Sequence, residues 1–269
     1  MINNIILGFI FFFLFSGVTM EINLLRNSKA IVLFLISIDY IRRKKIFQYF
    51  MLNIAGTLFH VSAFFYLPMY FILNKKKSKN TILCLFIIGN FIFIFSIRWI
   101  DYFLVQIVNI LNNRLASITK IYLESDYYSS SYGLTFGYIE RFMSFWVIYL
   151  FYDKLVKESK DNIIFINAFF IYIFIYLYFS EFMVISQRVP ILFAFSYWIL
   201  YPKIYSILSK NKKNIFLLIL LIYGSVRLLQ NSTQNFRYEN LLFDHSSYNE
   251  RRELTVKTLK KQAELFKNQ

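Results

Sequence analysis

A chain of 269 residues that is 58% hydrophobic and 21% aromatic has more apolar surface than one soluble core can bury, so a bilayer is its expected solvent. The net charge of +15 would suggest nucleic acid in a soluble protein. Here the basic residues stand in short clusters between apolar runs, so we interpret them as topology signals and expect no nucleic-acid partner.

About 20 helical residues cross the hydrocarbon core of a membrane. The first apolar run, residues 2–20, has no basic residue before it and no small-residue cleavage site after it, which indicates a retained helix rather than a signal peptide. The second, residues 30–41, is short but extends through Lys29 and Arg42, whose side chains can snorkel to the interfaces. Later spans are predicted at residues 81–99, 138–152, 163–185, 189–208 and 215–229.

Residues 46–73 lie between two basic clusters, residues 42–45 and 75–79, and a single crossing would leave one of these clusters outside. One continuous helix would be roughly 42 Å long, too long for one crossing and too short for two. A tight helical hairpin that turns near residues 59–63, with Pro68 in its returning limb, satisfies both constraints. The predicted fold is therefore all-α, a polytopic transmembrane helical bundle of about nine membrane segments including this short hairpin.

This threading predicts two regions, a transmembrane helical domain at residues 1–229 and a polar C-terminal tail at residues 230–269. It places the N-terminus and the basic loops on the cytoplasmic side, and a tyrosine-rich loop, residues 100–137, on the outer side. The tail falls outside with its basic residues, a mild conflict because no later helix is oriented by them.

Charged side chains beside apolar helices usually face a bundle interior or a wet cavity. A set of arginines on one side predicts an anionic ligand, because the guanidinium fork matches phosphate oxygens two at a time. Several candidates also have a structural alternative: Arg98 and Arg141 as snorkelling residues, His60 as a donor to a backbone carbonyl, Glu181 as a partner of Arg188. The outer candidates are Arg26, His60, Arg98, Asp101, Glu140, Arg141, Glu181 and Arg188.

The sequence contains no Walker loop, glycine-rich dinucleotide turn, HExxH helix or paired-cysteine site, and its single cysteine, Cys84, lies inside an apolar run. We therefore expect no cofactor and no bound metal.

Three short stretches carry a family resemblance. They are Arg26-x-x-x-Ala30 at a helix start, Phe59-His60-x-Ser62-Ala63 at the hairpin tip, and Gln187-Arg188 opening a helix that ends at Tyr201-Pro202. Together they resemble the EpsG-like and Wzy-type family of bacterial polysaccharide polymerases, which make O-antigen, capsule or exopolysaccharide. Family members generally carry further N-terminal spans, so the resemblance implies an N-terminally truncated member.

The resemblance implies a multi-pass enzyme of the bacterial cytoplasmic (inner) membrane. It implies a metal-independent glycosyltransferase reaction that moves glycan from an undecaprenyl diphosphate carrier to a lipid-linked acceptor unit at the outer face. The expected partners are the lipid bilayer, the undecaprenyl-diphosphate-linked oligosaccharide and a chain-length regulator. The diphosphate would be bound by Arg26, Arg188, Arg98 and Arg141, and the catalytic base would be His60 or Glu140.

Three other interpretations stay open. A lipid-linked oligosaccharide flippase or other transporter would usually show broken helices and pseudo-repeats, and we find no repeat here. A membrane acyltransferase would usually carry buried histidine or arginine on its cytoplasmic loops, and we find none here. A non-functional membrane fragment is the third.

Overall fold

The computed structural model describes residues 5–17, 25–100, 102, 134–230, 247–250 and 252–257. The chain divides into two compact units, Met1–Ile207 and Leu208–Gln269. Within the described ranges every regular element is a helix, so the all-α prediction is confirmed. In those same ranges, no helix combines the length and the apolar composition that crossing a membrane requires. The polytopic arrangement stays a prediction.

The first unit holds the elements from α1 to α13. They are α1 (Ile5–Phe12), the π-helical turn η1 (Phe13–Gly17), α3 (Leu25–Arg42), α4 (Ile46–Phe59), the 3-10 turn η2 (Val61–Tyr66), α5 (Met69–Ile72), α6 (Lys79–Ile94), α10 (Phe136–Glu158), α11 (Asn162–Tyr178), α12 (Met183–Arg188), the 3-10 turn η3 (Pro190–Phe193) and α13 (Phe195–Ile207). The second unit holds α14 (Lys210–Gln230) and helical residues at 248–250 and 252–257. Residues 103–133 of the predicted tyrosine-rich loop, and the candidate Asp101, lie outside the described residues.

The helical hairpin predicted from the basic clusters is present. Helix α4 ends at Phe59, and His60 takes an extended conformation (φ −154°, ψ 128°) from which η2 and α5 run back along α4. The hydroxyl of Tyr49 donates to the carbonyl oxygen of Tyr66 at 2.5 Å, and its ring centroid lies 5.2 Å from that of Tyr70. These contacts pair the early part of α4 with the late part of the returning limb, so the two limbs are antiparallel.

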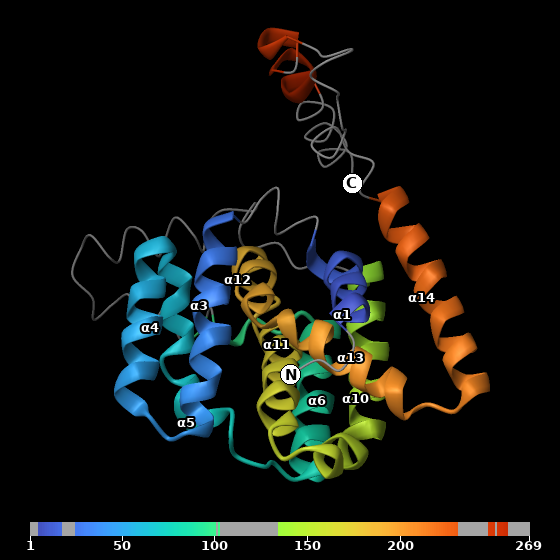
Figure 1. The fold of residues 1–269 in the computed structure, drawn as a ribbon. Helices are drawn as coiled ribbons and strands as arrows, with labels where there is room; N and C mark the ends of the chain where they lie inside the picture. Colours follow the sequence, from blue (N-terminus) through green and yellow to red (C-terminus); the bar gives the residue numbers. More distant parts are fainter. Residues whose placement is uncertain are drawn as a thin grey trace. The chain divides into compact units, whose positions relative to one another are not determined.

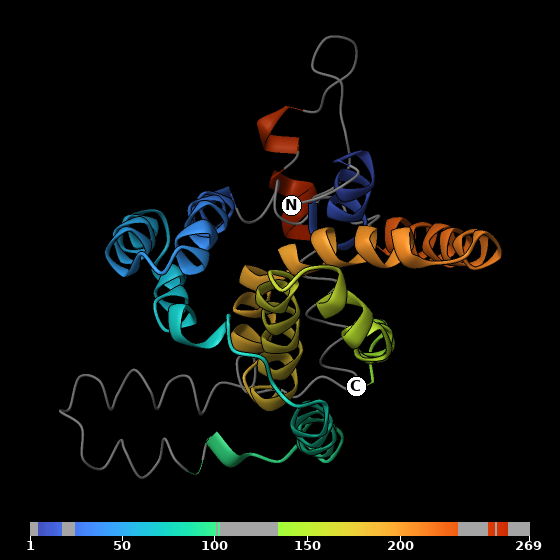
Figure 2. The ribbon, with the colours of Figure 1, turned by 60° about the horizontal axis from the view of Figure 1, so that its bottom comes forward.

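Helix α3 completes a three-part assembly with this hairpin and lies beside α4 in both views (Figures 1 and 2). A Cβ atom on Gly56 would lie 3.4 Å from Cβ of Ala63 and 3.9 Å from Cα of Ala30, so the backbones approach closely at these small residues. Below this contact the amide of Asn53 donates to Ser37 Oγ at 2.9 Å, and both residues are buried. The Arg26-x-x-x-Ala30 and Phe59-to-Ala63 stretches are thus neighbours in space.

Helix α11 is the centre of the rest of the first unit, where it contacts α6, α10, α12, α13 and η3. Its approach to α6 depends on Gly89, where a Cβ atom would come within 2.8 Å of the Tyr178 ring. Helices α6 and α10 meet through Phe86 and Phe145, whose stacked rings have centroids 3.5 Å apart. Polar capping begins two of these helices: Ser78 Oγ accepts from Thr81 N in α6, and Thr135 Oγ1 accepts from Tyr138 N in α10.

Two predicted spans are interrupted. Residues 163–185 were expected to form one helix, but α11 ends at Tyr178 and α12 begins only at Met183. Residues 189–208 were also expected to form one helix that Arg188 opens, whereas Arg188 is the last residue of α12 and η3 precedes α13. The reason is Pro190, which has no N–H to donate to the preceding turn and so interrupts the hydrogen-bond ladder.

Three connections, α3 to α4, α5 to α6 and α10 to α11, gather at one end of the first unit. Arg42 pairs with Asp161 across 3.2 Å, which joins the first connection to the third. The Asn167 amide donates to the carbonyl oxygens of Leu73 at 2.6 Å and Lys75 at 2.9 Å, which joins α11 to the second. These are the loops that the threading places on one side of the membrane.

Candidate functional site

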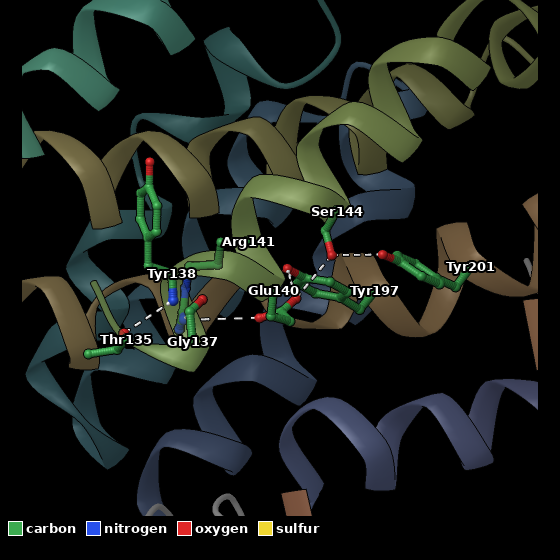
Figure 3. A network of polar contacts seen from close by, with 8 residues as sticks. All are labelled: Thr135, Gly137, Tyr138, Glu140, Arg141, Ser144, Tyr197 and Tyr201. Carbon is green, nitrogen blue, oxygen red and sulfur yellow. Dashed lines mark hydrogen bonds and ion pairs between the residues drawn. The ribbon is translucent and has the colours of Figure 1, made fainter. Parts of the chain in front are cut away.

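A buried carboxylate, Glu140, is the centre of a polar network near the start of α10 (Figure 3). Its side chain is only 9% exposed. Oε1 accepts hydrogen bonds from the Tyr197 hydroxyl at 2.7 Å and from Ser144 Oγ at 3.0 Å. The Tyr201 hydroxyl donates in turn to Ser144 Oγ at 2.7 Å. The two donors on one oxygen fix the carboxylate's orientation.

The second carboxylate oxygen has no hydroxyl donor in the described structure. Its recorded partner is Nη1 of Arg141 at 4.0 Å, the outer limit of an ion pair. Oε2 of Glu140 is therefore the oxygen on which a proton from another group can be accepted.

Arg141 is held between α10 and α11. Its guanidinium carbon lies 4.2 Å from the ring centroid of Tyr176 and 5.2 Å from that of Tyr172, and Nη1 donates to the carbonyl oxygen of Gly137 at 2.7 Å. Its Nε is buried and has no hydrogen-bond partner. Two aromatic faces and a neighbouring carboxylate compensate this cation, so the structure places it inside the helix assembly rather than in a snorkelling position.

Aromatic rings from α1 and α13 close one side of the network. Phe15, in η1, stacks on Tyr197 with ring centroids 4.3 Å apart, and Phe11 lies 5.4 Å from Tyr201. Tyr197 is fully buried, so its hydroxyl has one direction in which to donate, toward Glu140. The packing of α1 on α13 thereby helps to orient the carboxylate.

The other candidate base, His60, belongs to a separate polar cluster at the hairpin tip. Its Nδ1 lies 2.6 Å from Ser62 Oγ and accepts a hydrogen bond from Ser62 N at 3.2 Å. Ser62 Oγ also lies 3.4 Å from Oδ1 of the buried Asn27 in α3. These contacts link the hairpin tip to the start of α3.

Ser62 contacts Nδ1 of His60 through both its backbone N–H and its hydroxyl group, so this ring nitrogen is engaged inside the cluster. These two contacts anchor the His60 ring at the hairpin tip.

Among the described side chains, neither Arg98 nor Arg188 contributes a hydrogen bond to either cluster. Arg98 and Arg188 are both exposed. The backbone of Arg26 lies in the first turn of α3, while its side chain lies outside the described residues. Glu181, the alternative partner suggested for Arg188, accepts a hydrogen bond from Ile100 N at 2.7 Å.

Six residues were assigned to the catalytic base or to diphosphate binding. Of these six candidates, the structure brings Glu140 and Arg141 together, and the contacts of His60 involve other residues. Sequence reasoning missed the hydroxyl groups that surround Glu140. A spacing of four residues, which places two side chains on one helix face, was the available signal for Ser144 and for the Tyr197–Tyr201 pair. The distance of 57 positions between Tyr197 and Glu140 left no such signal between the helices.

The sequence matches the EpsG family over residues 1–243. The chain belongs to the EpsG family. This confirms the resemblance inferred from the three short stretches, and membership associates the chain with polysaccharide biosynthesis and with polymerases of the glycosyltransferase type. No curated protein and no solved structure matches the chain.

The match extends over both polar clusters and all six candidate residues of this EpsG-family chain. The likeness inferred from sequence, about residues 24–238, falls inside it. Because the match starts at residue 1, α1 and its contacts with Tyr197 and Tyr201 belong to the family region.

Proposed function

We propose that this EpsG-family protein is a polysaccharide repeat-unit polymerase embedded in the bacterial cytoplasmic membrane. It transfers glycan from an undecaprenyl diphosphate carrier to a lipid-linked acceptor unit at the outer face. The observation that carries the proposal is the buried Glu140 carboxylate, oriented by two hydroxyl donors and open at Oε2. Family membership supplies the reaction class, and this carboxylate supplies a base for it.

The reaction needs one proton transfer and one displacement. A sugar hydroxyl of the acceptor unit gives its proton to Glu140 Oε2, and its oxygen attacks the anomeric carbon of the growing chain. The bond from that carbon to the diphosphate oxygen breaks, and the lipid diphosphate leaves with the electron pair. Tyr197 and Ser144 hold Oε1 throughout, so the carboxylate does not rotate as it takes up the proton.

The leaving diphosphate requires cations and hydrogen-bond donors. We assign this role to Arg26 and Arg188, with Arg98 and Arg141 as further contributors. The exposure of Arg98 and Arg188 supports a role toward a ligand, because neither side chain is used in packing. Arg141, whose Nη1 donates to the carbonyl oxygen of Gly137, contributes its positive charge.

The membrane placement is supported by composition and by the position of both clusters. At 1.5 Å per residue, Glu140 lies roughly 20 Å along α10 from Asp153, which pairs with Lys79 at the end where the basic loops gather. His60 lies about as far along α4 from Lys45. Both candidate residues thus lie at the helix ends away from the basic loops, as an outer-face site requires.

The test compares lipid-linked and surface glycans on gels from cells with the gene deleted and cells complemented by this chain. Accumulation of single repeat units on deletion, with long polymer restored on complementation, is the expected result. Complementation with Arg26→Ala is expected to leave the chain in the membrane fraction without polymer. Loss of units from the outer face would instead assign the flippase function, and an unchanged glycan pattern would refute both.

A further inference from the structure

The end of the first unit that carries the gathered loops presents an exposed cluster of lysines, here called the basic face. Its members come from the connections α3 to α4 and α5 to α6, from the last part of α10 and from the connection α10 to α11. The lysines of the basic face are Lys44, Lys45, Lys75, Lys76, Lys77, Lys154, Lys157 and Lys160, and all eight are exposed.

The acidic residues of these loops do not neutralise the basic face. Within residues 39–45, 74–79 and 153–162 there are four acids, and three of them pair with bases outside the eight lysines. Those pairs are Asp39 with Arg43, Asp153 with Lys79 and Asp161 with Arg42. In the part of the chain that the structure describes, none of the eight lysines forms an ion pair, so the face keeps an uncompensated positive charge.

Side-chain and backbone contacts hold the three loops together. Beside the Arg42–Asp161 and Lys79–Asp153 pairs, the Tyr152 hydroxyl donates to the carbonyl oxygen of Lys77 at 2.8 Å. Lys44 adopts a left-handed conformation (φ 55°), and the bond from Lys45 N to the Tyr40 carbonyl ends α3 in a Schellman motif. The basic face is thus a fixed arrangement, and its charges come from segments more than one hundred residues apart.

Large apolar side chains are exposed directly beside these lysines. On α4, Phe47 is 70% exposed and Met51 53%, while Phe71 on α5 is 52% exposed and Leu150 on α10 is 67% exposed. Each lies within four residues or two helical turns of a lysine of the basic face. A nucleic acid or a soluble acidic protein could match the charges but would leave these rings and chains in water.

The interface of an anionic membrane accommodates both kinds of group. Apolar side chains can enter the boundary of the hydrocarbon region while the lysine ammonium groups contact lipid phosphates. We propose that the basic face binds the headgroups of anionic phospholipids. The inference rests on the membrane placement proposed above and does not depend on the polymerase reaction.

The test uses the full chain, purified in a nonionic detergent and immobilised on resin, with radiolabelled phosphatidylglycerol or phosphatidylcholine of the same acyl chains. We expect saturable binding that favours phosphatidylglycerol. This preference should decline as salt rises from about 0.1 M to about 1 M, because the Debye length falls from roughly 10 Å to roughly 3 Å. Equal binding of the two lipids, or a preference that salt does not change, would overturn the proposal.

Two variants that lose the same charge separate the basic face from general electrostatics. One replaces five loop lysines by glutamine, and the control replaces five basic residues of the C-terminal region. Each basic residue of a polybasic segment contributes binding free energy near an anionic membrane surface. The loop variant should therefore need at least about tenfold more phosphatidylglycerol for half-saturation, and the control less than about twofold more. The substituted residues are Lys44, Lys45, Lys75, Lys76 and Lys77 in the variant and Arg252, Lys257, Lys260, Lys261 and Lys267 in the control.

The remaining outcomes are also decisive. If the loop variant keeps the phosphatidylglycerol affinity of the unchanged chain, or if the control loses as much affinity, the assignment to this face is refuted. Stronger binding of poly-glutamate than of phosphatidylglycerol would also refute it. If the fivefold variant aggregates on gel filtration, the variant with Lys75, Lys76 and Lys77 replaced takes its place, and the salt series on the unchanged chain decides independently. Extraction of cell membranes with alkaline carbonate tests membrane placement separately, so its failure is distinguishable from a failure of lipid selectivity.

Discussion

Replacing Glu140 by glutamine tests the proposed base with little change in packing. The glutamine Oε1 can still accept from Tyr197 and Ser144, which donate at 2.7 Å and 3.0 Å in the unchanged chain. The substitution removes the negative charge 4.0 Å from Arg141 but leaves that cation against the Tyr176 ring at 4.2 Å. The variant should therefore fold and accumulate in the membrane fraction.

The expected loss of activity is large. General acid–base catalysis contributes roughly 10²- to 10⁴-fold, and an amide oxygen cannot replace a carboxylate as the proton acceptor. A milder companion is Tyr197→Phe, which removes one hydrogen bond to a charged group, worth about 1.5–3 kcal/mol, and keeps the ring stacked on Phe15. The lost hydrogen bond corresponds to a loss of activity of at least about tenfold. The loss should stay smaller than in Glu140→Gln, because Ser144 still holds Glu140 Oε1.

The assay follows polymer formation by membranes from the complemented strains, with lipid-linked repeat units extracted from the deletion strain as substrate. Rates are divided by the amount of chain measured on immunoblots of the same membranes. A Glu140→Gln variant with the rate of the unchanged chain would refute a catalytic role for this carboxylate. A Tyr197→Phe variant more damaged than Glu140→Gln would show that the tyrosine acts by another route than orienting the carboxylate.

Three further predictions concern particular positions. Gly89→Ala should lower the unfolding free energy in detergent by about 1–3 kcal/mol, because the added methyl would lie 2.8 Å from an atom of the Tyr178 ring. Gly56→Ala should be tolerated, because its methyl would lie 3.4 Å from Cβ of Ala63; equal effects of the two substitutions would contradict this reasoning. Lys44→Gly should raise the free energy of unfolding by about 1 kcal/mol, because glycine adopts the left-handed backbone at φ 55° without strain. Lys45→Gly should lower it, because φ is −95° there, and thermal unfolding in detergent distinguishes the two variants. Arg188→Ala should reduce polymer on glycan gels without reducing the amount of chain, because this side chain is exposed; polymer at the level of the unchanged chain would exclude Arg188 from diphosphate binding.

The hairpin shows how much of the fold follows from charge and length. On the positive-inside rule, the basic clusters at residues 42–45 and 75–79 disfavour a single crossing of the segment between them, and the turn was expected at residues 59–63. The structure turns at His60. This prediction succeeded because segment length and flanking charge are both written directly in the sequence.

The interruptions of the later helices were not predicted. The apolar runs at 163–185 and 189–208 continue through the breaks at residues 179–182 and 189–194, so hydropathy carries no sign of them. Pro190 was the local indication for the second break. The first break has no proline and depends on how α11 and α12 pack against their neighbours.

The sequence by itself determined the helical fold class, the hairpin, the family and the identity of Glu140 and Arg141 as candidates, because composition, charge clusters and short motifs are local properties. Only the tertiary structure decided that Tyr197 and Ser144 hold one oxygen of Glu140, that Ser62 contacts Nδ1 of His60, and that lysines of three separate segments form one face. Those contacts join helices that are far apart along the chain. Hydrogen bonds and charge interactions depend on the distance between the groups in space, which the order of residues does not give.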